Sequence, residues 1–296
     1  MTSPNTVSNL PFSVIIPTRG VRNSLQHVID ILLSCDPGPD EILVGFDDCE
    51  LLPLRGDSRL NVFRIHPQQG PGGCRQWLLK QARNKWVASF DDDSWPETID
   101  FFSRAAAILK NNSEIAVLSA ASHEAEFKGA RYQQISTYSG CGSIFSKAWM
   151  SRIVGFLPLR YAYGMEEVDV SLQLHEHGGL IVRDSQLRVI HDRSTSTSWD
   201  ENIGAHALAN NILFTWLRFP ISCLGVGLLR TLSYIKWQTQ YGSFSNIRRG
   251  LSFAWLKIIS FRHARRPVKE STLLSWLWLG SHPIPLTEIP EQKDPS

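Results

Sequence analysis

The chain has 296 residues, of which 43% are hydrophobic and 20% charged, and this composition excludes an intrinsically disordered chain. The formal net charge is only +2, but the stretch between Glu201 and Glu270 holds ten Lys and Arg and no acid. The five cysteines are scattered without CxxC spacing, which argues against a disulfide framework or a zinc site and favours a reducing compartment.

Strand and helix patterns alternate over the first 120 residues. Short apolar runs predict buried strands over 12–16, 41–46, 61–65, 85–90 and 115–120. Helices are predicted over 23–34, from a glycine-rich turn at 70–73 to about 84, and over 96–110. This alternation predicts an α/β fold, a mostly parallel sheet with helices on both faces, whose ligand site lies beyond the carboxyl ends of the strands.

Three of these strands end in polar residues: Pro17-Thr18-Arg19-Gly20, Asp47-Asp48 and Asp91-Asp92-Asp93. Alternate residues of a strand point the same way, so Asp91 and Asp93 are expected to share a divalent cation, Mg²⁺ or Mn²⁺. A solvated acidic loop is the alternative. Asp47-Asp48 suits hydrogen bonds from a nucleotide base or ribose, but Asp is also favoured in turns and helix caps.

The glycine-rich turn leads into Cys74 and Arg75. Backbone amides at the start of such a helix, Gly73 included, can bind phosphate, and Arg75 would add positive charge. The turn lacks the Lys-Ser/Thr pair of a Walker loop and is no dinucleotide fingerprint.

The second half opens with three acids in one predicted helical turn, Glu166, Glu167 and Asp169, on a helix over 166–176. Acids are favoured at a helix N-terminus, but crowded carboxylates repel, and burial raises the proton affinity of one of them, which suits a general base. Short strands over 180–182 and 187–190 then lead to His191, and a lone histidine is more often structural than a ligand.

The region 202–296 is predicted to form basic helices, followed by a Pro-rich end that is expected to be poorly ordered. Its longest apolar run, 221–229, is about half the length that spans a bilayer, and the polar N-terminus predicts no signal peptide. Basic helices carrying Trp216, Trp237 and Trp255 favour an anionic membrane surface. A packed appendage and a nucleic-acid surface are the alternatives, and we expect no nucleic-acid partner.

The order of these motifs, from PTRG to GMEEVDVSLQL and the later His, resembles the family 2 glycosyltransferases with the GT-A fold. The resemblance covers about 12–193, with looser matches at 210–220 and 265–268. It implies that Pro17, Thr18 and Arg19 line the nucleotide, that Asp47, with Asp48 beside it, contacts the base, and that Arg75 lies near the nucleotide. The chain departs from the family at Gln76, where Asn is usual, and at Glu167, where Asp is usual.

The resemblance also assigns the chemistry. Asp91 and Asp93 form the DXD motif, with Asp92 at the donor, and the expected metal ligands are Asp91, Asp93 and His191. Glu167 would be the catalytic base, with Glu166 beside it and Asp169 as the next candidate.

The function this implies is inverting, Mn²⁺- or Mg²⁺-dependent transfer from a nucleotide-diphosphate sugar to a saccharide or lipid-linked acceptor, in polysaccharide or glycolipid synthesis. We expect a GT-A catalytic domain over 1–201, with a nucleotide-sugar half over 12–120 and an acceptor half over 121–201, followed by a basic helical region over 202–296. The protein would work in the cytoplasm, peripherally at the inner face of the cell membrane.

Two other functions stay open. A sugar-phosphate nucleotidyltransferase would carry a glycine-rich signature with Lys soon after the first strand, where this chain has Pro17-Thr18-Arg19-Gly20. A catalytically silent nucleotide-sugar-binding module would not need Glu167 or His191.

Overall fold

The computed structural model describes residues 10–20, 24–126, 129–161, 165–192, 203–241 and 244–286. Within these ranges one 10-stranded sheet runs in the order β10-β7-β9-β6-β8-β4-β1-β2-β3, and β5 pairs with β9. The strands are β1 (Phe12–Thr18), β2 (Glu41–Asp47), β3 (Leu60–Ile65), β4 (Trp86–Ser89), β5 (Ser94–Pro96), β6 (Ile115–Ser122), β7 (Tyr132–Gln134), β8 (Ser143–Ser146), β9 (Leu180–His191) and β10 (Ile284–Leu286).

The core of the sheet is parallel. Strands β4, β1, β2 and β3 pair in parallel, as do β6 and β9, while β8 joins the two groups by antiparallel pairing. Every residue of β1 and β2 is buried, which is why both read as apolar runs without alternation. The predicted α/β fold with a mostly parallel core is confirmed.

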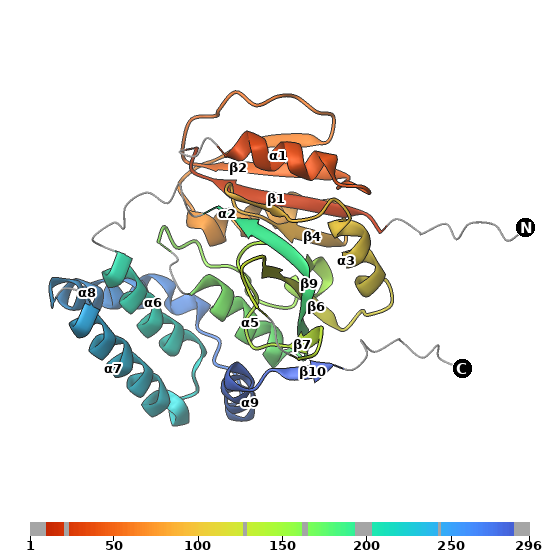
Figure 1. Ribbon diagram of the computed structural model, residues 1–296. Coiled ribbons are helices and arrows are strands. Elements are labelled where there is room, and N and C mark those ends of the chain that lie inside the picture. Colours follow the sequence, from red (N-terminus) through yellow and green to blue (C-terminus); the bar gives the residue numbers. More distant parts are fainter. Residues whose placement is uncertain are drawn as a thin grey trace, which may run out of the picture.

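Helices cover both faces of this sheet (Figure 1). Helices α1 (Leu25–Ser34) and α3 (Phe101–Leu109) pack into one apolar layer, and α2 (Gly70–Gln81) and α5 (Glu166–Glu176) pack into the other. A short helix, α4 (Lys147–Met150), follows β8 on the α2 side.

Three predicted boundaries near the acidic turn and β9 were wrong. The helix predicted from residue 96 begins only at Phe101, since Ser94–Pro96 pairs antiparallel with the end of β9. The strand before the acidic triplet ends at Ser89, so Asp91 and Asp93 lie in a turn and not on a strand. The two short strands predicted over 180–190 are one strand, β9, which is long enough to reach β5.

The predicted C-terminal helical region is present and consists of α6 (Ile203–Arg218), α7 (Leu224–Tyr241), α8 (Phe244–Phe261) and α9 (Glu270–Ser281). Helices α6, α7 and α8 lie together beside α5, on the left of Figure 1. After α9 the chain returns to the sheet, where β10 pairs with β7. The predicted domain boundary at 201/202 lies outside the described residues, and of the last dozen residues, expected to be poorly ordered, Pro285 and Leu286 belong to β10 and the rest lie outside them.

Candidate functional site

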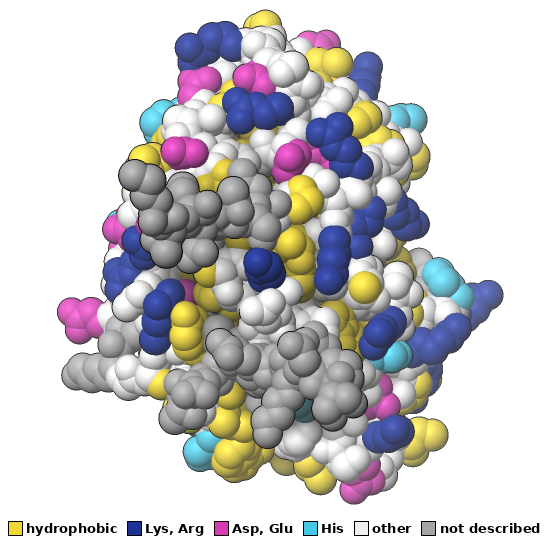
Figure 2. Space-filling view, turned by 90° about the vertical axis from the view of Figure 1, so that its right-hand side faces the viewer, with side chains coloured by type: hydrophobic (Ala, Val, Ile, Leu, Met, Phe, Trp, Pro, Cys, Tyr) yellow, Lys and Arg dark blue, Asp and Glu magenta, His cyan; other side chains and the backbone are white. Residues whose placement is uncertain are grey.

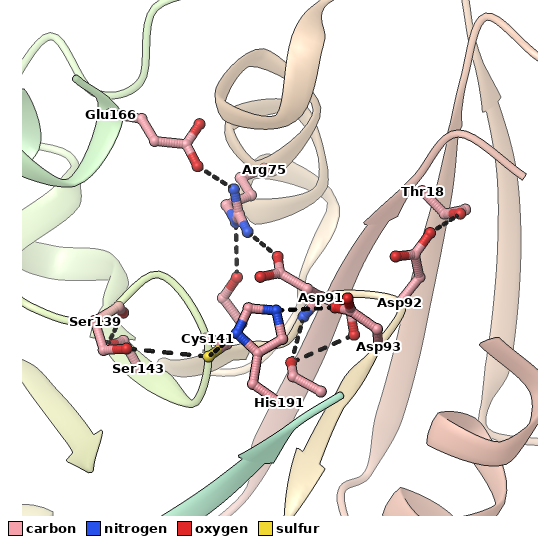
Figure 3. Close-up of polar contacts among 12 residues, drawn as sticks. Thr18, Arg75, Asp91, Asp92, Asp93, Ser139, Cys141, Ser143, Glu166 and His191 are labelled. Carbon is pink, nitrogen blue, oxygen red and sulfur yellow. Dashed lines mark hydrogen bonds and ion pairs between the residues drawn. The ribbon is translucent and has the colours of Figure 1, made fainter. Parts of the chain in front are cut away.

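The carboxyl ends of β1, β2 and β4 bring the predicted polar residues to one edge of the sheet. Thr18, at the end of β1, donates from Oγ1 to Oδ2 of Asp92 at 2.6 Å and accepts the backbone N–H of Gly20 at 3.0 Å (Figure 3). Ser24 donates to the backbone oxygen of Asp92 at 2.7 Å. The acidic turn is thus fixed to the loop after β1, and Arg19 is exposed beside it.

A potential cation site forms where β5 meets β9. The pairing of Ser94 with His191 brings that imidazole beside the acidic turn, with Nε2 3.2 Å from Oδ1 of Asp93. Asp91, Asp93 and His191 each offer one ligand atom, and these three atoms lie within 4.8 Å of one another. Two carboxylate oxygens and an imidazole nitrogen are a donor set that fits Mn²⁺, and the carboxylates alone also suit Mg²⁺.

The other nitrogen of His191 faces a thiol. Its Nδ1 lies 3.9 Å from Sγ of the buried Cys141 (Figure 3). The two ring nitrogens of His191 therefore face different partners, Asp93 and Cys141. Neither the spacing nor the composition of the sequence pointed to Cys141 in this place.

Arg75 lies beneath the site and joins two acidic groups. Its side chain is only 4% exposed, its Nε donates to Oγ of Ser89 at 3.0 Å, and its two terminal nitrogens pair with Asp91 and Glu166 (Figure 3). One guanidinium therefore connects the acidic turn after β4 with the start of α5. Through Asp91, Arg75 is connected to the cluster that could hold a cation.

The acids at the start of α5 are packed against glycines. A Cβ on Gly72 would lie 2.8 Å from Oε2 of Glu166, and a Cβ on Gly140 would lie 2.5 Å from Oε1 of Glu167. Burial raises the pKa of both glutamates, against the opposing charge of Arg75. A carboxylate with a raised pKa is a stronger proton acceptor when it is ionised, which suits a general base.

The third acid of this turn, Asp169, is oriented differently. It is 2% exposed and forms a two-pronged ion pair with Arg218, whose side chain is fully buried; Nη2 lies 3.0 Å from Oδ2. Gln173 also donates to Oδ2 at 3.0 Å. Both oxygens are occupied, so we propose a structural role for Asp169 and retain Glu167 as the candidate base.

The start of α2 is occupied by a protein carboxylate. Asp47 accepts the backbone N–H groups of Gln69 and Gly70 at 2.7 and 2.9 Å, so it caps the helix whose amides were expected to bind phosphate. Gly73 lies inside α2, where a Cβ would come within 2.9 Å of Pro158 Cα. These contacts favour structural roles for Asp47 and Gly73.

The neighbouring Asp48 is turned outward. It adopts a positive φ of 56°, and its Oδ1 lies 2.6 Å from Nδ1 of His66, a hydrogen bond that lowers the pKa of Asp48. It is half-exposed at the carboxyl end of β2. Asp48 is therefore the more accessible of the two acids for a ligand.

The fold resembles solved nucleotide-sugar enzymes. S. aureus TarS 1-349 in complex with UDP-GlcNAc superposes with a TM-score of 0.57 at 15% identity, over 86% of this chain and 82% of that one. GalNAc-T7 with UDP, GalNAc and Mn²⁺ gives 0.60 at 12% identity, over 72% of this chain, which spans about half (49%) of that one. The mannosyltransferase PcManGT from Pyrobaculum calidifontis, with GDP-Man and Mn²⁺, gives 0.55 at 12%, over 92% and 87%.

These similarities define the fold as GT-A, the fold that the resemblance of the motifs implied. The family model "Glycosyl transferase family 2" matches residues 13–164, about half of the chain. The chain therefore belongs to glycosyl transferase family 2, and the predicted resemblance is confirmed. No curated protein matches the sequence significantly.

Proposed function

We propose that this glycosyltransferase moves a sugar, with inversion, from a nucleotide-diphosphate sugar to the hydroxyl of a saccharide or lipid-linked acceptor. The observation that carries the proposal is the cluster of Asp91, Asp93 and His191, which Arg75 links to the acids of α5. Similar structures bind UDP-GlcNAc, UDP with GalNAc, and GDP-Man, the last two together with Mn²⁺, and this supports the same function.

In the proposed reaction, Glu167 takes the proton of the acceptor hydroxyl as that oxygen attacks the anomeric carbon, opposite the leaving diphosphate. A single displacement inverts that carbon and needs no enzyme nucleophile. Pro17, Thr18, Arg19 and Asp48 would line the nucleotide. A divalent cation held by Asp91, Asp93 and His191 would offset the negative charge that develops on the diphosphate.

We expect nucleoside diphosphate to bind at least about tenfold more weakly in EDTA than with Mn²⁺, a difference of about 1.4 kcal/mol in binding free energy. Without a cation, the carboxylates of Asp91 and Asp93 would repel the phosphates. Titration calorimetry with UDP and GDP measures this. Asp93→Asn should remove the Mn²⁺ effect, whereas Asp100→Asn, on an exposed acid paired with Arg104, should keep it. Equal affinity in EDTA and Mn²⁺ would exclude the metal, and a protein that binds no nucleotide or nucleotide-sugar is not a transferase of this kind.

We also propose that the C-terminal helices hold the enzyme on an anionic membrane at the cytoplasmic face. Among the residues that the structure describes, no helix is long and apolar enough to cross a bilayer. On α8, Leu251, Trp255 and Ile259 follow one another at i, i+4 and i+8 and are 43–66% exposed, and on α7 Leu228 and Leu232 are at least 50% exposed. Such apolar stripes suit the boundary between headgroups and acyl chains.

The basic residues of this region divide into two groups. Four of the ten face the protein: Arg218 pairs with Asp169, Lys257 bonds Asn210, Arg265 lies over the ring of Trp216, and Arg230 lies against the rings of Phe214, Phe219 and Trp276. Six are exposed: Lys236, Arg248, Arg249, Arg262, Arg266 and Lys269. The surface charge is thus smaller than the sequence count, but it is still of one sign.

The opposite side of the molecule has a different distribution of charge. Figure 2 shows the side turned away from α7 and α8, where acidic and basic side chains are interspersed. A second copy that used its own α7–α8 surface would bring like charges together, so charge complementarity favours anionic lipid as the occupant of this surface.

We expect the protein to float with liposomes that contain anionic lipid at low salt and to dissociate as salt screens the exposed charges, each worth up to about 1 kcal/mol near the surface. Leu256→Ser, on an exposed α8 residue, should weaken flotation. Leu51→Ser, which changes a similarly exposed leucine far along the chain, should not. If the protein ignores anionic liposomes at low salt, or elutes as a dimer that Leu256→Ser dissociates, the membrane proposal is wrong.

A further inference from the structure

The segment before the acids of α5 is held by the C-terminal helices. Asn210 of α6 donates from Nδ2 to the backbone oxygen of Tyr161 at 2.9 Å. The ring of Tyr161 stacks on the imidazole of His206, also of α6, with centroids 4.2 Å apart and planes 23° apart. Tyr161 is thus held both by its backbone and by its ring, shortly before Glu166 and Glu167.

Helix α8 contacts the same two residues of α6. Lys257 donates from Nζ to Oδ1 of Asn210, and Phe253 stacks on His206 with centroids 4.6 Å apart and planes 12° apart. Two rings can both stack on one imidazole only from opposite faces, so His206 lies between Tyr161 and Phe253. Phe253 and Lys257 are at i and i+4 and therefore share one face of α8.

The close approach of α8 to α6 makes these contacts possible. Gly250 is buried, and a Cβ there would come within 3.0 Å of the backbone oxygen of Ala205; Ala254, on the next turn, is also buried. Small residues at this interface let the helix axes approach, so that Lys257 reaches Asn210. The apolar stripe of Leu251, Trp255 and Ile259 lies on the exposed side of the same helix.

The polar part of this contact is costly to bury. Asn210 is fully buried, and burial lowers the pKa of Lys257 to about 8. Burying an ammonium group is unfavourable unless it makes good hydrogen bonds, and an apolar side chain would pack two helices at less cost. What the bond adds to packing is direction, because it runs from Lys257 through Asn210 to the Tyr161 carbonyl.

We infer that Lys257 and Asn210 are positioning residues of the transfer reaction, which set the acceptor-side segment at Tyr161 and through it the start of α5. The inference rests on the proposed function, because it concerns the placement of Glu167. The Asp169–Arg218 ion pair also fixes the first turn of α5 to α6. The C-terminal helices are on this view part of the acceptor side and not an addition to a finished catalytic domain.

The test compares two variants that remove the same charge from the same helix. Lys257→Met keeps the volume of the side-chain stem but ends the bond to Asn210, whereas Arg248→Met changes an exposed residue. We expect Lys257→Met to lower kcat/KM for the acceptor by about 10- to 100-fold, since small misplacements of reacting groups have effects of this size. The affinity for nucleoside diphosphate should be unchanged, and Arg248→Met should transfer like wild type.

A second variant tests the direction of the bond. Asn210→Asp keeps a partner for Lys257 but places an acceptor against the Tyr161 carbonyl, so it should show the same acceptor defect. Hydrogen exchange of peptides that span residues 157–161 should quicken in Lys257→Met and Asn210→Asp and not in Arg248→Met. This readout needs no turnover, so it tests the Lys257–Asn210–Tyr161 contact separately from the proposed function, which fails instead if wild type transfers no sugar.

The inference is overturned if Lys257→Met and Asn210→Asp, folded as judged by near-UV circular dichroism, match Arg248→Met in acceptor kinetics and in exchange. It is also overturned if both variants lose nucleotide affinity in parallel with turnover, because the contact would then serve the whole fold and not the acceptor side.

Discussion

Glu167→Gln is expected to lower the rate of sugar transfer by about two to four orders of magnitude, the usual contribution of a general base. The amide has almost the shape of the carboxylate but cannot take the proton of the acceptor hydroxyl. Nucleoside diphosphate should bind as it does to wild type, because the donor residues at the strand ends are untouched. A transfer assay with the identified donor, beside calorimetry, measures both quantities.

The control for this experiment is Asp169→Asn, on the other acid of the same helical turn. Its partner Arg218 is fully buried, so the variant should lose thermal stability, because a buried guanidinium is left without its counter-ion. If Glu167→Gln transfers at nearly the wild-type rate while Asp169→Asn is folded and inactive, Asp169 is the base and the assignment of Glu167 is wrong.

Arg218→Met should lower the free energy of unfolding by about 3–5 kcal/mol, the range found when one partner of a buried ion pair is removed. Asp169 is 2% exposed, so its carboxylate cannot recover the lost interaction from water. The variant also loses the bond from Nη1 to the backbone oxygen of Ala264, at 3.0 Å. Urea unfolding, followed by circular dichroism, measures the change.

Two further variants separate the ion pair from packing. Asp169→Leu combined with Arg218→Met should recover much of the lost stability, because no unpaired charge then stays buried. Arg266→Met, on an exposed arginine that bonds only backbone oxygens among the described contacts, should change stability by less than about 0.5 kcal/mol. If Arg218→Met lowers the free energy of unfolding by less than about 1 kcal/mol, the ion pair does not contribute to stability as proposed.

The sequence by itself determined the class of fold and the edge of the sheet at which the site lies. Strands β1 and β2 are apolar throughout because both of their faces are covered, and the polar residues after them mark where each strand ends. These are local signals, readable in a window of a few residues. The order of the motifs then predicted the family, which the family model confirms.

The neighbours of the three acids of α5 were less predictable from the sequence than the position of the helix. Glu166, Glu167 and Asp169 look alike in sequence, since all three lie in the first turn of α5 and all three suit a helix N-terminus. Helical rotation points them to different neighbours: Glu166 meets Arg75, Glu167 lies against Gly140, and Asp169 meets Arg218. Only those neighbours distinguish a candidate base from a structural acid.

The tertiary structure alone decided which distant residues meet. His191 reaches Asp93 because β5, absent from the sequence prediction, pairs with β9, and three residues are too few to show a strand period. Arg75 joins Asp91 to Glu166, and Lys257 reaches Tyr161 through Asn210, across separations at which sequence spacing carries no information. Local propensity fixes the elements, but burial requires each charged group to find a partner, and that partner is set by how the elements pack.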